Sequence, residues 1–274
     1  MSRAPSEVYI ASHDDSVLLS HRWRTAENSA AHLLPHLAPS SKVLDVGCGP
    51  GTISIDFAKR IPNGHVTGID YSDSVIATAQ SAASQSKISN VTFAIGDVYK
   101  LDFPDNTFDI VHAHQLLQHL EHPEEALQEM RRVTKPGGLV AARESDWASM
   151  AWYPELPAIA QWHKLHESVA GAHGCEPNAG RRLHFWAHKA GFRRDLITAS
   201  STTWCWREKG DREWWSKSAG GRLLAPEFAD KAAKQGVQRA ELEKIQEGWN
   251  NWAQEEDGWF SIMHGEVICR KSVE

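Results

Sequence analysis

Short apolar runs alternate with amphipathic stretches along the first 145 residues of the chain. The apolar, β-branched runs predict five strands, at about 42–46, 65–70, 91–95, 108–112 and 139–144. Apolar positions at helical spacing predict helices between them, at 52–60 with Thr52 as the N-cap, at 72–85 and at 123–132. Because strands and helices alternate at this interval, we expect parallel β-α-β units in an open α/β sheet.

The two ends of the chain show a different pattern. Apolar spacing over 21–37 predicts a helical preface within residues 1–40. After residue 145, helical insertions at about 154–190 and 211–256 flank a predicted strand at 196–206, and a last strand is predicted at 259–270. We expect the late strands to complete the sheet and the insertions to cap its carboxyl edge. The chain is then a single domain over 1–274, with a core at about 41–145 and a lid with final strands at about 146–274.

Composition and charge exclude several classes of protein. Acidic residues outnumber basic ones by 35 to 29, and the arginine pairs at 131–132, 181–182 and 193–194 are isolated, so no basic run grips a phosphate backbone. The four cysteines form no C-x-x-C and indicate neither a disulfide framework nor a zinc site. No apolar stretch has the roughly 18 residues of a membrane helix, and the first residues lack a signal-peptide pattern. We therefore expect a cytoplasmic protein that binds neither nucleic acid nor membrane.

The most informative segment is 43–52, Val-Leu-Asp-Val-Gly-Cys-Gly-Pro-Gly-Thr. An apolar run stops at three alternate glycines and a helical pattern then begins, which predicts a strand, a tight turn and a helix start. This is where an open α/β sheet binds its ligand, since glycines let the backbone approach and the first helix amides point at it. A dinucleotide fingerprint has its third glycine three residues beyond the second, so the spacing here argues against a nicotinamide oxidoreductase.

Asp45 stands two residues before the first of these glycines. With it, the segment resembles the D-x-G-x-G-x-G first motif of class I S-adenosylmethionine (SAM)-dependent methyltransferases. That resemblance implies a Rossmann-like class I methyltransferase sheet, here with a helical, Trp-rich lid, and SAM as the cofactor.

Two acids follow the next two predicted strands. Asp70 comes 19 residues after the last glycine, about the spacing of the acid that binds a ribose diol in βαβ nucleotide sites. Tyr71 is then placed to pack on ribose or adenine. Asp97 is expected to accept from the adenine amino group, with Val98 supplying a backbone amide. The family of the resemblance uses the positions of Asp70 and Asp97 in these ways; the structural alternatives are a helix cap for Asp70 and a turn for Asp97.

The methionine end of SAM is expected to lie against Gly47, Gly49 and the backbone after the fourth strand, around His112 to Gln115. Asp45 either binds the amino group through water or braces the glycine loop. Related small-molecule methyltransferases bring an N-terminal Tyr or Arg to the SAM carboxylate, so Tyr9 and Arg24 are candidates, with solvent exposure as the alternative.

Methyl transfer needs an acceptor lone pair in line with the methyl, so positioning and desolvation supply much of the catalysis. His114 is the first candidate for a general base because it lies just past the fourth predicted strand, and His119 and Asp146 come next. His163 and His166, on a predicted lid helix, are weaker candidates. Each histidine also has a purely structural interpretation. The acids show no grouping suited to a metal, so none is expected.

Eleven of the twelve tryptophans fall in the last 128 residues. Six are candidates to line an apolar acceptor pocket: Trp147, Trp152, Trp162, Trp186, Trp214 and Trp215. Most are expected to be lid core, with two or three touching substrate. The excess favours a small aromatic or heterocyclic acceptor and requires no obligate protein partner.

Residues 20–145 resemble the ubiquinone/menaquinone-biosynthesis-type methyltransferases, which act on carbon, oxygen, nitrogen or sulfur. The final third is similar in layout to small fungal secondary-metabolism enzymes, above all the S-methyltransferases that cap gliotoxin-type dithiols. The resemblance implies thiol methylation of a reduced epidithiodiketopiperazine, which caps or detoxifies it. The alternatives are O- or C-methylation of an aromatic or quinone-like metabolite, and a SAM-binding protein without transfer, such as a pericyclase or regulator.

Overall fold

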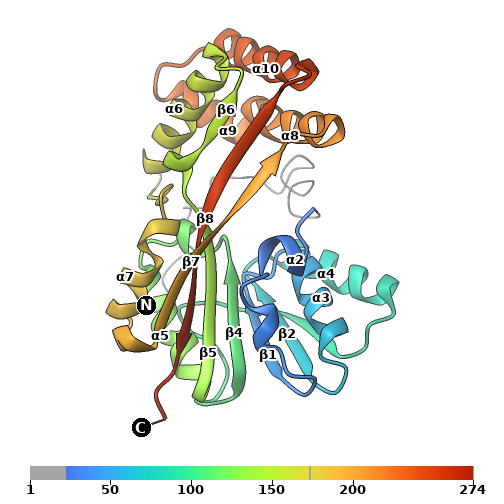
Figure 1. Cartoon of the computed structure of the whole chain (residues 1–274), viewed down its shortest axis with the longest axis vertical. Coiled ribbons are helices and arrows are strands. Elements are labelled where there is room, and N and C mark those ends of the chain that lie inside the picture. Colours follow the sequence, from blue (N-terminus) through green and yellow to red (C-terminus); the bar gives the residue numbers. More distant parts are fainter. Residues whose placement is uncertain (1–22, 173, 274) are drawn as a thin grey trace.

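An eight-stranded sheet runs through the computed structural model, which describes residues 23–172 and 174–273 (Figure 1). Its strand order is β3-β2-β1-β4-β5-β8-β6, and β7 pairs with β8. Strands β1 to β5 are parallel, and β8 is antiparallel to β5, β6 and β7. The bounds are β1 Lys42–Val46, β2 His65–Asp70, β3 Val91–Ile95, β4 Phe108–His114, β5 Thr134–Ser145, β6 Ala151–Tyr153, β7 Ile197–Trp206 and β8 Trp259–Arg270. The predicted α/β class is confirmed.

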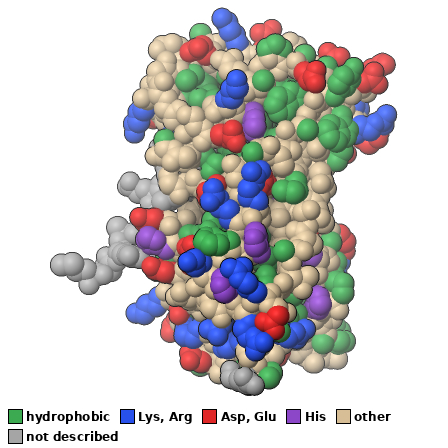
Figure 2. Space-filling view, turned by 60° about the vertical axis from the view of Figure 1, so that its left-hand side comes forward, with side chains coloured by type: hydrophobic (Ala, Val, Ile, Leu, Met, Phe, Trp, Pro, Cys, Tyr) green, Lys and Arg blue, Asp and Glu red, His purple; other side chains and the backbone are tan. Residues whose placement is uncertain are grey.

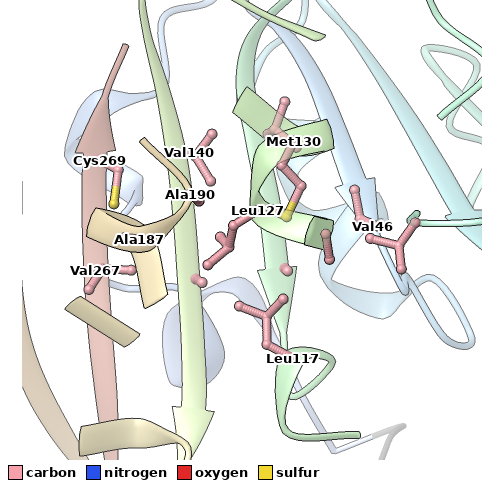
Figure 3. Close-up of a cluster of buried hydrophobic side chains, with 14 of the residues drawn as sticks. Val46, Leu117, Leu127, Met130, Val140, Ala187, Ala190, Val267 and Cys269 are labelled. Carbon is pink, nitrogen blue, oxygen red and sulfur yellow. The ribbon is translucent and has the colours of Figure 1, made fainter. Parts of the chain in front are cut away.

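Helices cover both faces of the parallel part of the sheet. Alternate residues of one strand face opposite layers: Val43 packs with α2, α3 and α4, whereas Leu44 packs with α5 and α7. Figure 3 shows the second of these layers, where Leu127 and Met130 of α5 and Ala187 of α7 meet the sheet. The bounds are α2 Ala26–Ser29, α3 Thr52–Arg60, α4 Asp73–Ser86, α5 Pro123–Val133 and α7 Leu183–Lys189.

A second helical layer stands over the carboxyl edge of the sheet (Figure 1). It contains α6 Pro157–Ala172, α8 Lys209–Gly221, α9 Pro226–Ala233 and α10 Arg239–Gln254. Its core is aromatic, and the ends of β7 and β8 reach into it with Trp206 and Phe260. The rings of Trp206 and Trp215 stack with centroids 4.0 Å apart, and Trp249 and Trp252 are fully buried. The helical, Trp-rich lid is therefore observed.

Several predicted elements differ from the observed ones. A single helix was predicted over 21–37. In the described part of this range the structure has only the short helix α2, followed by turns and a 3-10 turn at Leu34–His36. Helix α3 begins at Thr52, but its N-cap is Gly51, at φ 80°, and no side chain caps it. Strand β5 starts five residues earlier than predicted, and β6 was not predicted.

Helix α7 was predicted to belong to the lid, but it packs against the sheet. Residues 183–189 fall in the first predicted insertion, yet α7 packs in the same core as α5, β5 and β8, and Trp186 belongs to that core. The two insertions have similar apolar spacing, and spacing does not say which layer a helix joins.

Four of the six arginines singled out in the sequence form ion pairs in the described part of the chain. Figure 2 shows Lys and Arg side chains gathered over the lower part of one face, with acidic side chains beside them. Among these arginines, Arg132 pairs with Glu129, Arg181 with Asp146 and Arg193 with Asp195. In the part of the chain that the structure describes, no helix combines the length and the apolar character that a bilayer crossing requires.

Candidate active site

The glycine loop between β1 and α3 opens onto a cavity. Gly47, Gly49 and Gly51 all have positive φ, of 67°, 54° and 80°, a conformation that residues with a Cβ seldom adopt. A Cβ at Gly51 would lie 2.7 Å from the Phe93 ring, whereas a Cβ at Gly49 would have no atom within 4 Å. Gly51 is therefore needed for packing, and Gly49 leaves its backbone open toward the cavity.

This cavity has a volume of about 570 Å³, within the range of small-molecule sites. We call it the cofactor cavity. Among the predicted cofactor residues, its lining includes Arg24, Asp45, Gly47, Gly49, Asp70, Tyr71, Asp97 and Val98. Segments that are far apart in sequence thus meet at the carboxyl ends of β1, β2 and β4, as predicted for an open α/β sheet.

The two acids predicted to hold the nucleoside lie on this lining. The Asp70 carboxylate accepts from the Gly49 amide at 3.1 Å and from the Ser72 amide at 3.0 Å. It therefore ties the glycine loop to the start of α4. Asp97 accepts from the Tyr99 amide at 2.9 Å. Tyr71 is 62% exposed, so its ring is accessible at the cavity rim.

Asp45 is held between two polar side chains. One of its oxygens is 2.7 Å from Nδ1 of His112, and the other accepts from the Ser54 hydroxyl at 2.5 Å. His112 is fully buried, lies edge-on to Phe57 and is not on the cavity lining. These contacts favour the bracing role for Asp45 and make His112 its partner rather than a direct cofactor contact.

Arg24 reaches the cofactor cavity from the N-terminal side, and Tyr9 lies outside the described residues. The Arg24 guanidinium donates to Oε1 of Gln115 at 2.5 Å, and the amide nitrogen of Gln115 is 2.9 Å from Nε2 of His264. Gln115 itself has φ 49°, which turns the chain sharply after β4. Arg24 is thus fixed against the loop predicted to hold the methionine end of SAM.

A second cavity, of about 140 Å³, lies between the sheet edge and the lid. We call it the acceptor cavity. Its lining includes the aromatic side chains of Trp23, Trp147, Trp162, Trp204, Trp206, Trp214, Trp215 and Phe228, and those of His119, His166 and His264. Arg24, Gln115 and His119 line both cavities and so mark their junction. Of the six predicted tryptophans, Trp147, Trp162, Trp214 and Trp215 lie on this lining, whereas Trp152 and Trp186 do not.

The two predicted histidine bases have different surroundings. His114 is 5% exposed and lines the cofactor cavity, and within the described chain neither of its ring nitrogens has a hydrogen-bond partner. Burial lowers its pKa well below the usual range, and the nearby Arg24 and Arg143 lower it further. Burial likewise lowers the pKa of His119 to about 4, with smaller effects from Arg24 and Arg222. Both imidazoles are neutral at physiological pH.

Asp146 is not brought to either cavity lining. Its buried carboxylate accepts from Nε and Nη2 of Arg181, both at 2.6 Å, so a bidentate ion pair occupies both oxygens. The prediction that Asp146 follows directly on β5 was correct. Its ion pair with Arg181, 35 positions away, could not be predicted from the local sequence.

We expect Asp146→Asn to change the turnover rate by no more than about threefold, because its oxygens hold Arg181 and not the acceptor. A general base contributes about 10²–10⁴-fold, so the kinetics of the purified variant separate the two roles. A loss of about 100-fold with normal folding would instead assign Asp146 to proton transfer.

Gln115 lies in the segment predicted to face the methionine end of SAM, whereas several other lining residues were not predicted: Trp23, Gln118, Trp204, Trp206, Arg222 and His264. Trp204 and Trp206 alternate along β7, a period-2 signal that was available in the sequence. The others show no local signal. Among the described residues, no group of three or more His, Cys, Asp or Glu side chains is arranged to hold a metal ion.

The residues present fit SAM. The open position beside Gly49, the carboxylate at the end of β2 and the guanidinium of Arg24 match the backbone, diol and carboxylate contacts that this cofactor needs. When bound, SAM supplies an electrophilic methyl group on a cationic sulfur. The acceptor cavity with its mostly aromatic walls adjoins the junction, where that methyl would be received, and an apolar lining disfavours water around reacting groups.

Comparison with known proteins shows the family to which the chain belongs. Residues 37–219 match the family model described as a methyltransferase domain. An uncharacterized methyltransferase of Schizosaccharomyces pombe is 36% identical over 283 residues and aligns over 99% of both chains. The chain belongs to the methyltransferase domain family, as a SAM-dependent methyltransferase of class I.

Two further comparisons refine this picture. The "probable methyltransferase ltbC" of Aspergillus luteorubrus is 30% identical over 96% of this chain and 97% of its own. Demethylmenaquinone methyltransferase of Listeria monocytogenes is 38% identical, but over only 45% of this chain and 52% of its own. The Schizosaccharomyces and Aspergillus proteins thus align along nearly the full chain, whereas the Listeria enzyme aligns with less than half of it.

Solved structures show the same fold. The YcgJ protein of Bacillus subtilis has a TM-score of 0.56 and 17% identity, over 90% of this chain and 99% of its own. The [4+2]-cyclase SpnF has a TM-score of 0.55 and 23% identity, over 94% of this chain and 82% of its own. The predicted Rossmann-like sheet is confirmed.

Proposed function

We propose that this methyltransferase S-methylates a thiol of a small, largely apolar metabolite, and that a reduced epidithiodiketopiperazine of the gliotoxin type is such an acceptor. The observation that carries the proposal is the chemistry of the junction between the two cavities. The described side chains there are a guanidinium, an amide and an imidazole whose pKa burial lowers to about 4. The weakly basic imidazole of His119 and the positive charge of Arg24 suit a methyl acceptor that loses its proton easily.

Acceptor acidity distinguishes the possible substrates. A thiol has a pKa of about 8.5 and a phenol about 10, so a thiol is already a few per cent ionised at neutral pH. Arg24 lowers the pKa of His119 through its positive charge, and the same charge favours a thiolate at the junction. The phenol would need a stronger base than an imidazole of pKa about 4.

The walls of the acceptor cavity also suit sulfur. They are mostly indole rings, and sulfur makes favourable contacts with aromatic edges. A dry cavity of about 150 Å³ holds a benzene ring in another protein, so a cavity of about 140 Å³ admits one ring or one thiol-bearing arm at a time. We infer that only the thiol-bearing part of a larger acceptor enters this cavity. We also propose that the protein acts in the cytoplasm and needs no protein partner.

Methylation of an aromatic or quinone-like metabolite at oxygen or carbon is the second candidate. The partial similarity to a demethylmenaquinone methyltransferase supports it, as does the aromatic lining. It requires a base stronger than the imidazole at the junction.

An acceptor panel tests the proposal. Purified protein with SAM is offered a reduced gliotoxin-type dithiol, a phenol and a hydroquinone of similar size, and S-adenosylhomocysteine and product masses are measured. We expect the dithiol to turn over at least about tenfold faster than either oxygen acceptor, with one methyl added per sulfur. Turnover of the oxygen acceptors alone would overturn thiol specificity, and SAM binding without any turnover would favour the non-transferase interpretation.

A further inference from the structure

Three histidines line the acceptor cavity: His119, His166 and His264. A neutral imidazole has one N–H and one lone pair, so its neighbours decide which nitrogen is the acceptor. The hydrogen bonds around each of the three histidines fix this choice. Only one of the three rings then keeps a nitrogen lone pair that a ligand can use.

His119 lies at the end of a hydrogen-bond chain with a single direction. The indole N–H of Trp147 donates to the Ser145 hydroxyl at 3.0 Å, and that hydroxyl donates to Oε1 of Gln118 at 2.5 Å. The amide nitrogen of Gln118 therefore faces Nε2 of His119, at 3.1 Å, and donates to it. Nδ1 of the same ring is 3.6 Å from the Cys175 sulfur. Both ring nitrogens of His119 are thus engaged by the protein.

His264 is fixed by the same logic. Because Arg24 can only donate, Oε1 of Gln115 is its acceptor and the Gln115 amide nitrogen faces Nε2 of His264, at 2.9 Å. The Nε2 lone pair of His264 therefore accepts from Gln115.

His166 has the opposite arrangement. Its Nδ1 is 3.2 Å from the carbonyl oxygen of Trp162, which can only accept, so Nδ1 carries the proton. The ring lies between those of Trp162 and Phe228, with centroid distances of 4.6 and 4.5 Å. No hydrogen bond from the described residues reaches Nε2. The imidazole faces an aromatic cavity with one unused lone pair.

We propose that Nε2 of His166 accepts a hydrogen bond from the nucleophilic group of the methylated substrate. On the proposed function, this group is the S–H of a thiol. The new S–C bond forms with a sulfur lone pair, and the bond between the methyl and the SAM sulfur breaks with its electron pair left on that sulfur. This hydrogen bond holds the acceptor's proton while the S–C bond forms, and the proton then passes to solvent. As sulfur shares its lone pair with the methyl group, S–H becomes strongly acidic, so water suffices as the base and Nε2 acts as a hydrogen-bond acceptor.

Two substitutions separate this role from packing. His166→Asn keeps a donor near Nδ1 but removes the acceptor at Nε2, whereas His166→Gln keeps an acceptor near Nε2. We expect kcat/KM for the acceptor to fall about three- to tenfold in H166N and to return within about twofold of wild type in H166Q. The SAM dissociation constant should not change in either.

His163→Gln is the matched control on the same helix, because the Nε2 of His163 faces the Trp147 carbonyl at 2.8 Å and glutamine retains that bond. Its kcat/KM should equal that of wild type. Equal losses in H166N and H166Q would overturn the proposal and leave His166 a packing residue.

Nitrogen-15 NMR of histidine-labelled wild-type protein gives a test without an acceptor. The expected spectrum shows His166, assigned by its loss in H166Q, as the neutral Nδ1–H tautomer. An Nε2–H tautomer would overturn the inference. The H166N and H166Q variants can be compared with any substrate that is methylated at an X–H group. Thiol specificity is tested separately by the acceptor panel.

Discussion

Asp70→Ala should raise the dissociation constant for SAM by about 10- to 100-fold, which corresponds to the loss of charge-assisted hydrogen bonds worth about 1.5–3 kcal/mol. Asp70 lies at the carboxyl end of β2 on the cofactor cavity, where its carboxylate is placed to accept from a ribose diol. Titration calorimetry of the purified variant with SAM measures the effect directly.

Asp70 also accepts from the amides of Gly49 and Ser72, so loop disorder has to be separated from lost cofactor contacts. The two amides donate to different oxygens of Asp70, so Asp70→Asn keeps an acceptor for one of them and removes the charge. We expect it to recover part of the unfolding midpoint and part of the affinity. Asp73→Ala, in the exposed first turn of α4, is the matched control and should bind SAM as wild type does. Unchanged affinity in Asp70→Ala would remove the ribose role.

The cofactor half of the site was predictable because its signals are local. The glycine loop follows β1, Asp70 is the last residue of β2 and Asp97 stands two residues after β3. Parallel strands bring their carboxyl ends to one edge of a sheet. Position in sequence then translates into position in space. The same reasoning found β8 at its observed bounds, because an apolar run of that length has few other interpretations.

The acceptor half was only partly predictable because distant segments build it. Trp23 lies at the N-terminal side, yet its ring centroid is 5.0 Å from that of Trp204 and 5.2 Å from that of Trp214. Gln115 meets His264 across 149 positions. No local pattern encodes such pairs, nor the Arg181 that engages Asp146. Tertiary packing alone decides which histidine nitrogen faces a ligand.

Glu144→Ala should destabilise the protein by about 3–6 kcal/mol at pH 5, the cost of three amides that lose their acceptor. The fully buried carboxylate accepts from the amides of Leu116 and Leu117 at 2.9 and 2.8 Å and from that of Gln118 at 3.4 Å. These amides start the loop that carries His119 to the junction of the two cavities. Denaturant unfolding followed by tryptophan fluorescence measures the loss.

The size of this effect should depend on pH, with a defined sign. Burial raises the pKa of Glu144 from about 4.5 to about 7, against the three amides, which lower it. The folded state therefore binds this proton more tightly, and its contribution to stability is complete below about pH 4.5 and is lost as pH rises through about 7. A shift of this size corresponds to about 3 kcal/mol, so the gap between wild type and Glu144→Ala should narrow from pH 5 to pH 8. Glu144→Gln keeps an acceptor oxygen and cannot titrate, so its stability should lack this pH dependence. A gap that widened toward pH 8 would mean that the amides outweigh burial and hold the carboxylate ionised in the folded protein.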